Sequence, residues 1–205
     1  MIFGNKNEKG ITLVEIIVAI FIITLFSLIT ITDFPKIKRQ FSISRATYKL
    51  AQDIRRTEDL GLSGVQVNGA SDAKGYGFYI NRFSNDREYL IYADIAPTDA
   101  DADRLFTYGS SACPSGTDGD CVVETIDILE DEPGVYIKNI FYVNDADVSI
   151  DANWLSINFN PPNPTVIITT NAGVADRIGI VLGLELDNSV ERTVYVNSSG
   201  LIEVE

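Results

Sequence analysis

The amino-terminal stretch constrains this chain more than any other, because a short polar leader runs directly into a long apolar segment. Residues 1–10 form the leader, and residues 11–31 are apolar except for Glu15 and scattered hydroxyl side chains. As a helix, the apolar segment would measure about 32 Å, which matches the ~30 Å hydrocarbon thickness of a membrane. It is too long for the apolar part of a secretory signal peptide, and no small-residue cleavage site follows it. We therefore predict a membrane-spanning helix over residues 11–32.

Basic residues flank this segment on both sides, so the positive-inside rule alone does not decide its orientation. The junction is more specific, because residues 9–15 read Lys-Gly-Ile-Thr-Leu-Val-Glu. It resembles the amino-terminal signature of type IV pilins and type II secretion pseudopilins, with Ile11 where that family usually has Phe. The resemblance implies that a prepilin peptidase cuts between Gly10 and Ile11 and methylates the new amino terminus. It also implies that the leader lies in the cytoplasm.

Glu15 needs a compensating interaction, because a charged side chain within a spanning helix costs roughly 2.5–3.5 kcal/mol. Cleavage would create an ammonium group on Ile11. In a bundle of subunits, the Ile11 ammonium of a neighbour would attract Glu15 by about 4 kcal/mol at 4 Å and an effective dielectric constant of 20. We interpret Glu15 as an assembly residue that fixes the axial register between subunits, as the resemblance implies. The alternative is a solvated carboxylate near the membrane surface.

Composition argues against several other functions. The formal net charge is −13 and histidine is absent. Strong acidity disfavours nucleic-acid binding, and the lack of histidine removes the commonest general base and metal ligand. The sequence has no phosphate-binding glycine loop, nucleophile elbow or metalloprotease pair. We therefore expect no enzyme activity, no catalytic or metal-binding residues and no cofactor.

Cys113 and Cys121 are the two cysteines of the chain, and a loop rich in Gly, Asp and Ser separates them. On an exported domain, this arrangement predicts a disulfide that closes a surface hairpin. Two free thiols would require a reducing compartment, and a zinc site would lack further Cys or His ligands.

Beyond the apolar segment, Pro35 should kink or interrupt the helix because proline lacks a backbone N–H. An amphipathic pattern then resumes, and Gly61 and Gly64 should end it. Its apolar face is formed by residues at helical spacing: Ile43, Thr47, Leu50, Ile54 and Thr57. Its polar face carries charged residues that we interpret as a solvated surface: Arg45, Lys49, Asp53, Arg56 and Glu58.

Everything after Gly75 has strand character, so the predicted fold class is α+β: a long amino-terminal helix followed by an antiparallel all-β head. The expected strands are residues 76–81, 88–93, 122–128, 135–143, 154–159, 166–170, 178–186, 193–196 and 201–204. Residues 82–87 should form a hairpin connection, residues 197–200 a tight turn, and residues 160–164 a loop. The predicted divisions are a leader over 1–10, a membrane helix over 11–32, an amphipathic extension over 33–64 and a β-rich head over 65–205.

Three weaker motifs each have a plainer interpretation. Asp99, Asp101 and Asp103 resemble the opening of an EF-hand, but Arg104 stands where glycine is required. A solvated acidic loop is the better interpretation, and a weak ion site involving this loop or Asp118 and Asp120 is the alternative. The glycosylation sequon at Asn197 reads as a turn. A basic strip that includes Arg55 lacks the interleaved aromatics of a DNA-binding surface.

The layout is similar to that of minor pilins, and most of all to the H-type minor pseudopilin of type II secretion. The resemblance implies a structural subunit of a type IV pilus or a type II secretion pseudopilus, assembled through its amino-terminal helix. Its partners would be other pilin subunits, a prepilin peptidase and a membrane assembly platform protein. It would span the cytoplasmic membrane once, with the head outside. The alternative function is a membrane-tethered binding module, an adhesin or DNA-uptake receptor, at a filament tip.

Overall fold

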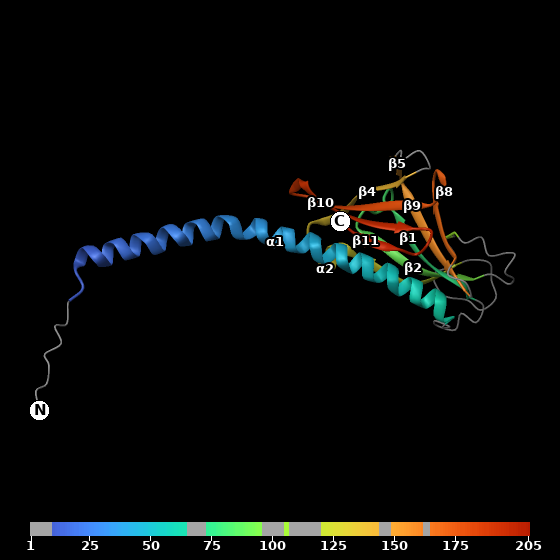
Figure 1. The fold of residues 1–205 in the computed structure, drawn as a ribbon, viewed down its shortest axis with the longest axis horizontal. Helices are drawn as coiled ribbons and strands as arrows, with labels where there is room; N and C mark the ends of the chain where they lie inside the picture. Colours follow the sequence, from blue (N-terminus) through green and yellow to red (C-terminus); the bar gives the residue numbers. More distant parts are fainter. Residues whose placement is uncertain (1–9, 65–72, 96–104, 107–119, 144–148, 162–164) are drawn as a thin grey trace, which may run out of the picture. The chain divides into compact units, whose positions relative to one another are not determined.

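The computed structural model describes residues 10–64, 73–95, 105–106, 120–143, 149–161 and 165–205. The chain divides into two compact units, Met1–Arg39 and Gln40–Glu205. The first contains the amino-terminal part of helix α1, and the second contains the rest of α1 and all the strands (Figure 1). The predicted α+β fold class is confirmed.

Helix α1 extends from Leu13 to Ser63 and contains Pro35 in its interior. The prediction that Pro35 interrupts the helix is therefore wrong. Proline removes one backbone hydrogen bond, but the bonds of the turns before and after it remain and can carry the helix through. The helix ends where Gly64 adopts a left-handed φ of +59°, which a residue with a side chain rarely adopts.

The amphipathic face predicted for the second half of α1 is confirmed. Ile43, Leu50 and Ile54 are buried in the main hydrophobic core, and Ala46 and Ala51 join them there. Thr47 and Thr57 are also buried, and each hydroxyl donates to the backbone carbonyl four residues earlier. These bonds satisfy the buried hydroxyls within the helix itself.

Gly61 lies inside α1, so the expectation that it helps to end the helix is wrong. A Cβ atom on Gly61 would lie 2.6 Å from the Phe159 carbonyl oxygen and 2.8 Å from its Cβ. Such distances are below ordinary van der Waals contact, so this position requires glycine. Gly61 is a packing residue that lets α1 approach a strand closely.

The first sheet is antiparallel, with strand order β3-β2-β1-β6-β7-β8. The expected hairpin around residues 82–87 is confirmed, because β1 and β2 pair directly. The strands of this sheet are β1 Ala73–Asn81, β2 Glu88–Ile95, β3 Cys121–Asp127, β6 Trp154–Asn160, β7 Thr165–Thr170 and β8 Gly173–Ala175.

The second sheet is also antiparallel, with strand order β11-β10-β9-β4-β5. Its strands are β4 Val135–Val143, β5 Ser149–Ala152, β9 Arg177–Leu184, β10 Asp187–Asn197 and β11 Ile202–Val204. The tight turn between β10 and β11 is confirmed: the Asn197 side-chain oxygen accepts from the amides of Ser199 and Leu201. Gly200 completes the turn with φ +84°.

Three short elements were missed. Helix α2, Ile128–Asp131, begins at Ile128, the last residue of the strand predicted over 122–128, and β5 and β8 were not expected. The Asp127 side chain accepts from the Leu129 amide and caps α2, which explains the change from strand to helix. Asn160 closes β6 rather than opening a loop, and most of the expected loop 160–164 lies outside the described residues.

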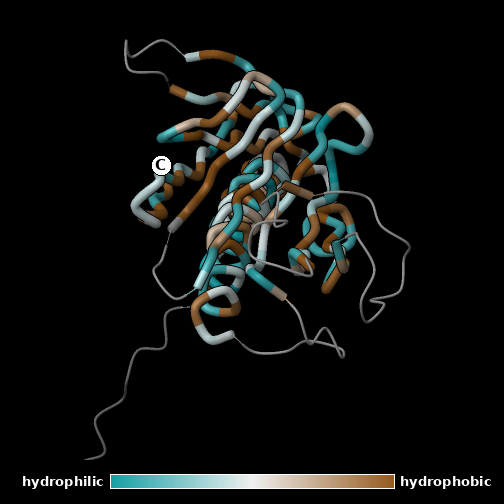
Figure 2. Tube along the Cα trace, turned by 90° about the vertical axis from the view of Figure 1, so that its right-hand side faces the viewer, coloured by the Kyte–Doolittle hydropathy of each residue, from teal (hydrophilic) through white to brown (hydrophobic). Residues whose placement is uncertain are grey.

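The main core lies where the buried face of α1 meets the inner faces of both sheets, and it draws residues from every strand that the structure describes. Figure 2 shows the pattern behind this arrangement, with apolar and polar residues alternating along the strands. The second half of α1 is therefore an integral part of the β head.

Candidate functional site

The start of α1 places the predicted processing residues outside the helix. Gly10 and Ile11 are exposed and precede the first helical residue, Leu13. Thr12 caps the helix: its hydroxyl oxygen accepts from the Glu15 amide at 3.3 Å, and its carbonyl oxygen accepts from the Ile16 amide at 3.3 Å. The Gly10–Ile11 peptide bond thus lies in open, non-helical chain, where proteolysis usually occurs.

Glu15 occupies the first turn of α1 and is exposed. A carboxylate in the first turn is stabilised by the helix dipole, by typically 0.3–1 kcal/mol at an exposed site. The Thr-x-x-Glu spacing of Thr12 and Glu15 is also the sequence signature of a capping box. Sequence analysis missed this local role, although the spacing was available to reveal it.

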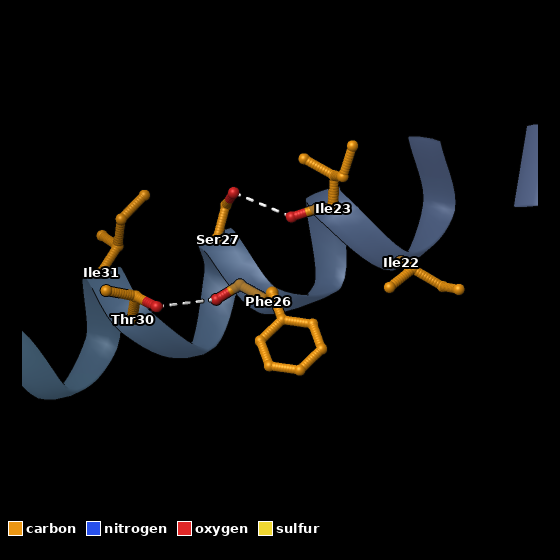
Figure 3. Close-up of a pocket in the computed structure, with 6 residues that line it drawn as sticks. All are labelled: Ile22, Ile23, Phe26, Ser27, Thr30 and Ile31. Atoms are coloured by element: carbon orange, nitrogen blue, oxygen red, sulfur yellow. Dashed lines mark hydrogen bonds between the residues drawn. The ribbon is translucent and has the colours of Figure 1, made fainter. Parts of the chain in front are cut away.

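The apolar segment exposes its large side chains along its whole length, from Ile11 at 73 % to Ile31 at 72 %. This helix is long and apolar enough to cross a membrane, judged by length and composition. Its hydroxyls are turned back onto the helix: Ser27 donates to the Ile23 carbonyl at 2.8 Å and Thr30 to the Phe26 carbonyl at 2.9 Å (Figure 3). Thr24 does the same with Ile20. The segment therefore combines apolar side chains with hydroxyls that need no outside partner.

The side chains around Ile22, Phe26 and Ile31 border a shallow, open hollow on this helix (Figure 3). Its lining is mostly apolar, and the hydroxyls of Ser27 and Thr30 that border it already donate to backbone carbonyls. Such a surface suits lipid chains or the side chains of neighbouring helices.

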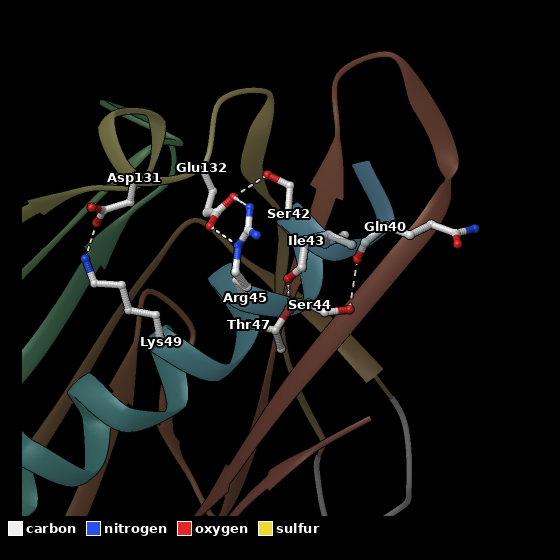
Figure 4. Close-up of polar contacts among 9 residues, drawn as sticks. All are labelled: Gln40, Ser42, Ile43, Ser44, Arg45, Thr47, Lys49, Asp131 and Glu132. Atoms are coloured by element: carbon white, nitrogen blue, oxygen red, sulfur yellow. Dashed lines mark hydrogen bonds and ion pairs between the residues drawn. The ribbon is translucent and has the colours of Figure 1, made fainter. Parts of the chain in front are cut away.

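The charged face of the second half of α1 contacts the β head rather than only solvent. The Arg45 guanidinium binds the Glu132 carboxylate with two hydrogen bonds, of 2.5 and 2.9 Å, and the Ser42 hydroxyl donates to the same carboxylate at 2.5 Å (Figure 4). Lys49 forms an ion pair with the neighbouring Asp131. The interpretation of these residues as a merely solvated surface is therefore wrong.

Two further basic residues of α1 also contact the β head. Arg56 pairs with Glu124 of β3 at 2.7 Å, and Arg55 donates to the Ile202 carbonyl at 3.1 Å. Hydrogen bonding to Arg45 lowers the pKa of Glu132, although partial burial opposes that shift. The basic strip considered for DNA thus uses its charges within the protein. Sequence analysis missed the acidic partners because α2, which contains Asp131 and is followed by its C-cap Glu132, was not predicted.

Cys121 is buried at the start of β3, beside Tyr76, Ala93 and Ile95. Cys113 lies outside the described residues, so its pairing with Cys121 stays a prediction. Asp99, Asp101, Asp103 and Asp118 also lie outside them. Within the described ranges, no group of three or more His, Cys, Asp or Glu side chains converges as a metal site.

These features define a class: a protein with an apolar amino-terminal helix long enough to cross a membrane and a β-rich head. Comparison with protein families supports a type IV pilin-like protein, because the family model for the prokaryotic N-terminal methylation motif matches residues 5–31. No curated protein and no solved structure matches the chain.

Proposed function

We propose that this chain is a minor pilin or pseudopilin, a structural subunit of a type IV pilus or of a type II secretion pseudopilus. The single observation that carries the proposal is the methylation-motif helix, which exposes apolar side chains throughout and holds one carboxylate, Glu15, in its first turn. The large apolar side chains of this helix are exposed, and packing among identical or related helices would cover them.

In this proposal a prepilin peptidase cleaves the Gly10–Ile11 bond. The open backbone before Thr12 supports this step, since the helix would not need to unwind. The new Ile11 ammonium of one subunit would then pair with Glu15 of a neighbour, and the pair would set the axial register. The precursor would span the cytoplasmic membrane once, with the leader inside and the head outside. A membrane assembly platform protein would receive it. Assignment to the H-type subfamily remains part of the proposal.

Leader processing tests the proposal directly. The full chain is co-expressed with a prepilin peptidase, and the membrane-extracted product is examined by amino-terminal sequencing and mass spectrometry. The sequence should begin at Ile11, with a methylated amino group. Gly10→Val should accumulate precursor, whereas Gly4→Val, a matched change inside the leader, should be processed normally. A mature chain that begins downstream of residue 31 would refute the assignment.

A further inference from the structure

The β head has two ends, and its contacts with α1 distinguish them. Where α1 enters the head, Ser42 and Arg45 bind Glu132, the residue that caps α2 (Figure 4). Near the other end of this helical segment, Gly61 lies against Phe159, close to the last residue of β6. We call the end marked by Arg45 and Glu132 the entry end.

The connection between β1 and β2, residues 82–87, lies at the entry end. The Arg87 carbonyl oxygen accepts a 2.8 Å hydrogen bond from the amide of Ile128, the first residue of α2. The neighbouring Asp86 carbonyl accepts from the Ile137 amide, near the start of β4, at 2.7 Å. The connection therefore packs against α2 and the strand that follows it.

The connection between β9 and β10, residues 185–186, lies at the same end. β9 ends at Leu184, which pairs with Val135, the first residue of β4. The Glu185 amide donates to the Gly134 carbonyl at 3.0 Å, and the Glu185 carboxylate forms an ion pair with Arg87. The two connections are thus joined directly to each other.

Large apolar side chains are exposed at this end of the head. Phe83, in the first connection, is 88 % exposed, and Leu186, in the second, is 76 % exposed. Phe41, beside the α1 residues that contact Glu132, is 62 % exposed. One exposed apolar residue is ordinary on a protein surface, but several at one end of a domain indicate a contact surface.

The backbone that carries Phe83 is held in place by hydrogen bonds. The Asn81 Oδ1 accepts from the amides of Phe83 and Ser84 at 3.1 and 3.2 Å. The adjacent Arg82 guanidinium donates to the Lys138 carbonyl at 2.7 Å and to a further oxygen of β4, on Asn139, at 2.8 Å. A side chain presented by an ordered turn loses little backbone entropy when it meets a partner.

Chain length places the entry end close to the proposed membrane segment. Residues 32–39 separate that segment from Gln40, the first residue of the head unit. Eight residues span about 12 Å as a helix, and the headgroup layer covers about 5–7 Å of that distance. Because the connecting segment attaches at the entry end, this end stays near the bilayer at every angle between the two units.

Charge favours an anionic membrane surface. Residues 32–39 contain three basic side chains and one acidic side chain, so the connecting segment has a net charge of +2. Basic residues beside a spanning helix attract anionic lipid headgroups. Three carboxylates at the entry end are paired with basic side chains and repel such a surface less than free ones would: Glu132 with Arg45, Asp131 with Lys49, and Glu185 with Arg87.

We propose that the entry end docks on the membrane that residues 11–32 cross, with Phe83, Leu186 and Phe41 inserted among the headgroups of anionic phospholipids. The inference rests on the proposed function, since it requires the amino-terminal helix to span the bilayer. Apolar and aromatic side chains are stabilised in the interfacial region. Docking would hold the head against the membrane before assembly, and extraction of the subunit into a filament would release it.

Tryptophan reporters test this contact in the full chain, reconstituted in vesicles of phosphatidylcholine and phosphatidylglycerol in equal parts. The one native tryptophan is removed by Trp154→Phe, and Phe83→Trp or Leu186→Trp is introduced into that background. Leu201→Trp is the matched control, because Leu201 is exposed and follows β10 at the opposite end of the head. Lipids brominated near the headgroup end of their acyl chains should quench both reporters at least about twofold more than the control.

A second variant asks whether the apolar side chains supply the binding energy. Phe83→Ser, added to the Leu186→Trp reporter, should lower the docking equilibrium constant by about tenfold, because one large apolar side chain is no longer buried. Leu201→Ser in the same reporter should leave the quenching unchanged. Equal quenching in all three proteins would overturn the role of Phe83 as an anchor.

Alkaline extraction separates this inference from the proposed function. A chain that resists extraction, but whose two reporters are quenched no more than Leu201→Trp, would overturn the docking and leave the pilin proposal intact. A chain released by alkali would refute the spanning helix, and both proposals with it. Reporters that are shielded from aqueous iodide only at high protein-to-lipid ratio, without quenching by brominated lipid, would show that another subunit covers this end, and would also overturn membrane docking.

Discussion

The hydroxyl of Tyr89 donates a 2.6 Å hydrogen bond to the carboxylate of Asp53, and so joins β2 to the carboxyl-terminal part of α1. Tyr89 is buried, and its ring packs against Phe78 with 5.0 Å between the ring centroids. Burial, and then the hydrogen bond to Asp53, raise the pKa of Tyr89 above its ordinary value, so the hydroxyl stays a donor at physiological pH. The helix is thus held to the head by a specific polar bond within an apolar contact.

Tyr89→Phe should destabilise the head by about 0.5–1.5 kcal/mol, because it removes one hydrogen bond and leaves the ring in place. The expected fall in Tm is roughly 2–6 °C in thermal unfolding of the full chain in micelles. Tyr48→Phe is the matched control, since Tyr48 lies on the same helix and is exposed. Equal Tm values for Tyr89→Phe and wild type would show that the bond to Asp53 contributes nothing.

Glu132→Gln should weaken the dependence of stability on acidity. The pKa of Glu132 is lowered in the folded protein, chiefly by hydrogen bonding to Arg45. Its contribution is therefore fully present above the ordinary glutamate pKa, and is lost as pH falls through the lowered value. In urea unfolding measured from pH 7 to pH 3, the variant should lose less stability than wild type. Glu130→Gln, on the exposed side of α2, should follow wild type; parallel curves for all three proteins would contradict the prediction.

Gly61→Ala tests the close approach of α1 to β6. Alanine is usually favoured over glycine in a helix by about 1 kcal/mol. Here the added methyl group would meet the Phe159 backbone, and overpacking of this kind typically costs about 1–3 kcal/mol. We expect a lower Tm, opposite in sign to the helix propensity. A higher Tm would mean that the helix can shift away from the strand without loss.

Glu15→Val should impair assembly without harming the fold of the head. The change removes a charge from an apolar helix, so membrane insertion should be at least as efficient as in wild type. Loss of the proposed pair with a neighbouring Ile11 should reduce filament incorporation by about tenfold or more, measured by immunoblot of sheared filaments. The effect would be milder for a subunit at the filament tip, which has no neighbour above it. Wild-type incorporation in the shaft would identify Glu15 as a passive interfacial carboxylate.

The cysteine pair is checked by intact mass. If Cys113 and Cys121 are bridged, the non-reduced chain should be lighter than the reduced chain by two hydrogens, about 2 Da. Such a short loop should stabilise the head by somewhat under ~3 kcal/mol in the chain-entropy model. Alkylation of both thiols in the unreduced native protein would exclude the bridge.

The sequence predicted those parts of the fold in which a periodic pattern is long. The buried stripe that includes Ile43, Leu50 and Ile54 repeats over several turns, and β4 was predicted with its observed bounds. The pattern failed for α2, because four residues hold barely one turn and a local cap decides their conformation. The predicted interruption at Pro35 was wrong for a related reason. The tendency of one proline to break a helix is local, and here it is outweighed by the long helical segments on both sides.

The candidate site, like the fold, was predictable from the sequence only where it depends on a local motif. The motif around Gly10 and Glu15 is local and was recognisable, and the family comparison matches it. The pairing of Arg45 with Glu132 was not predictable, because it joins residues 87 positions apart through an element that the pattern missed.

The hydroxyls of Thr24, Ser27 and Thr30 are each occupied by a carbonyl of their own helix. These three hydroxyls would then form no directional bonds between neighbouring helices, so they would not fix the rotation of one helix about its axis relative to the next. In a filament of the kind proposed, Glu15 would fix each subunit's height, while the turn angle would follow from the shape of the apolar side chains. Related subunits with different heads could then share one helical core, because contacts of shape tolerate small rotations that directional hydrogen bonds would forbid.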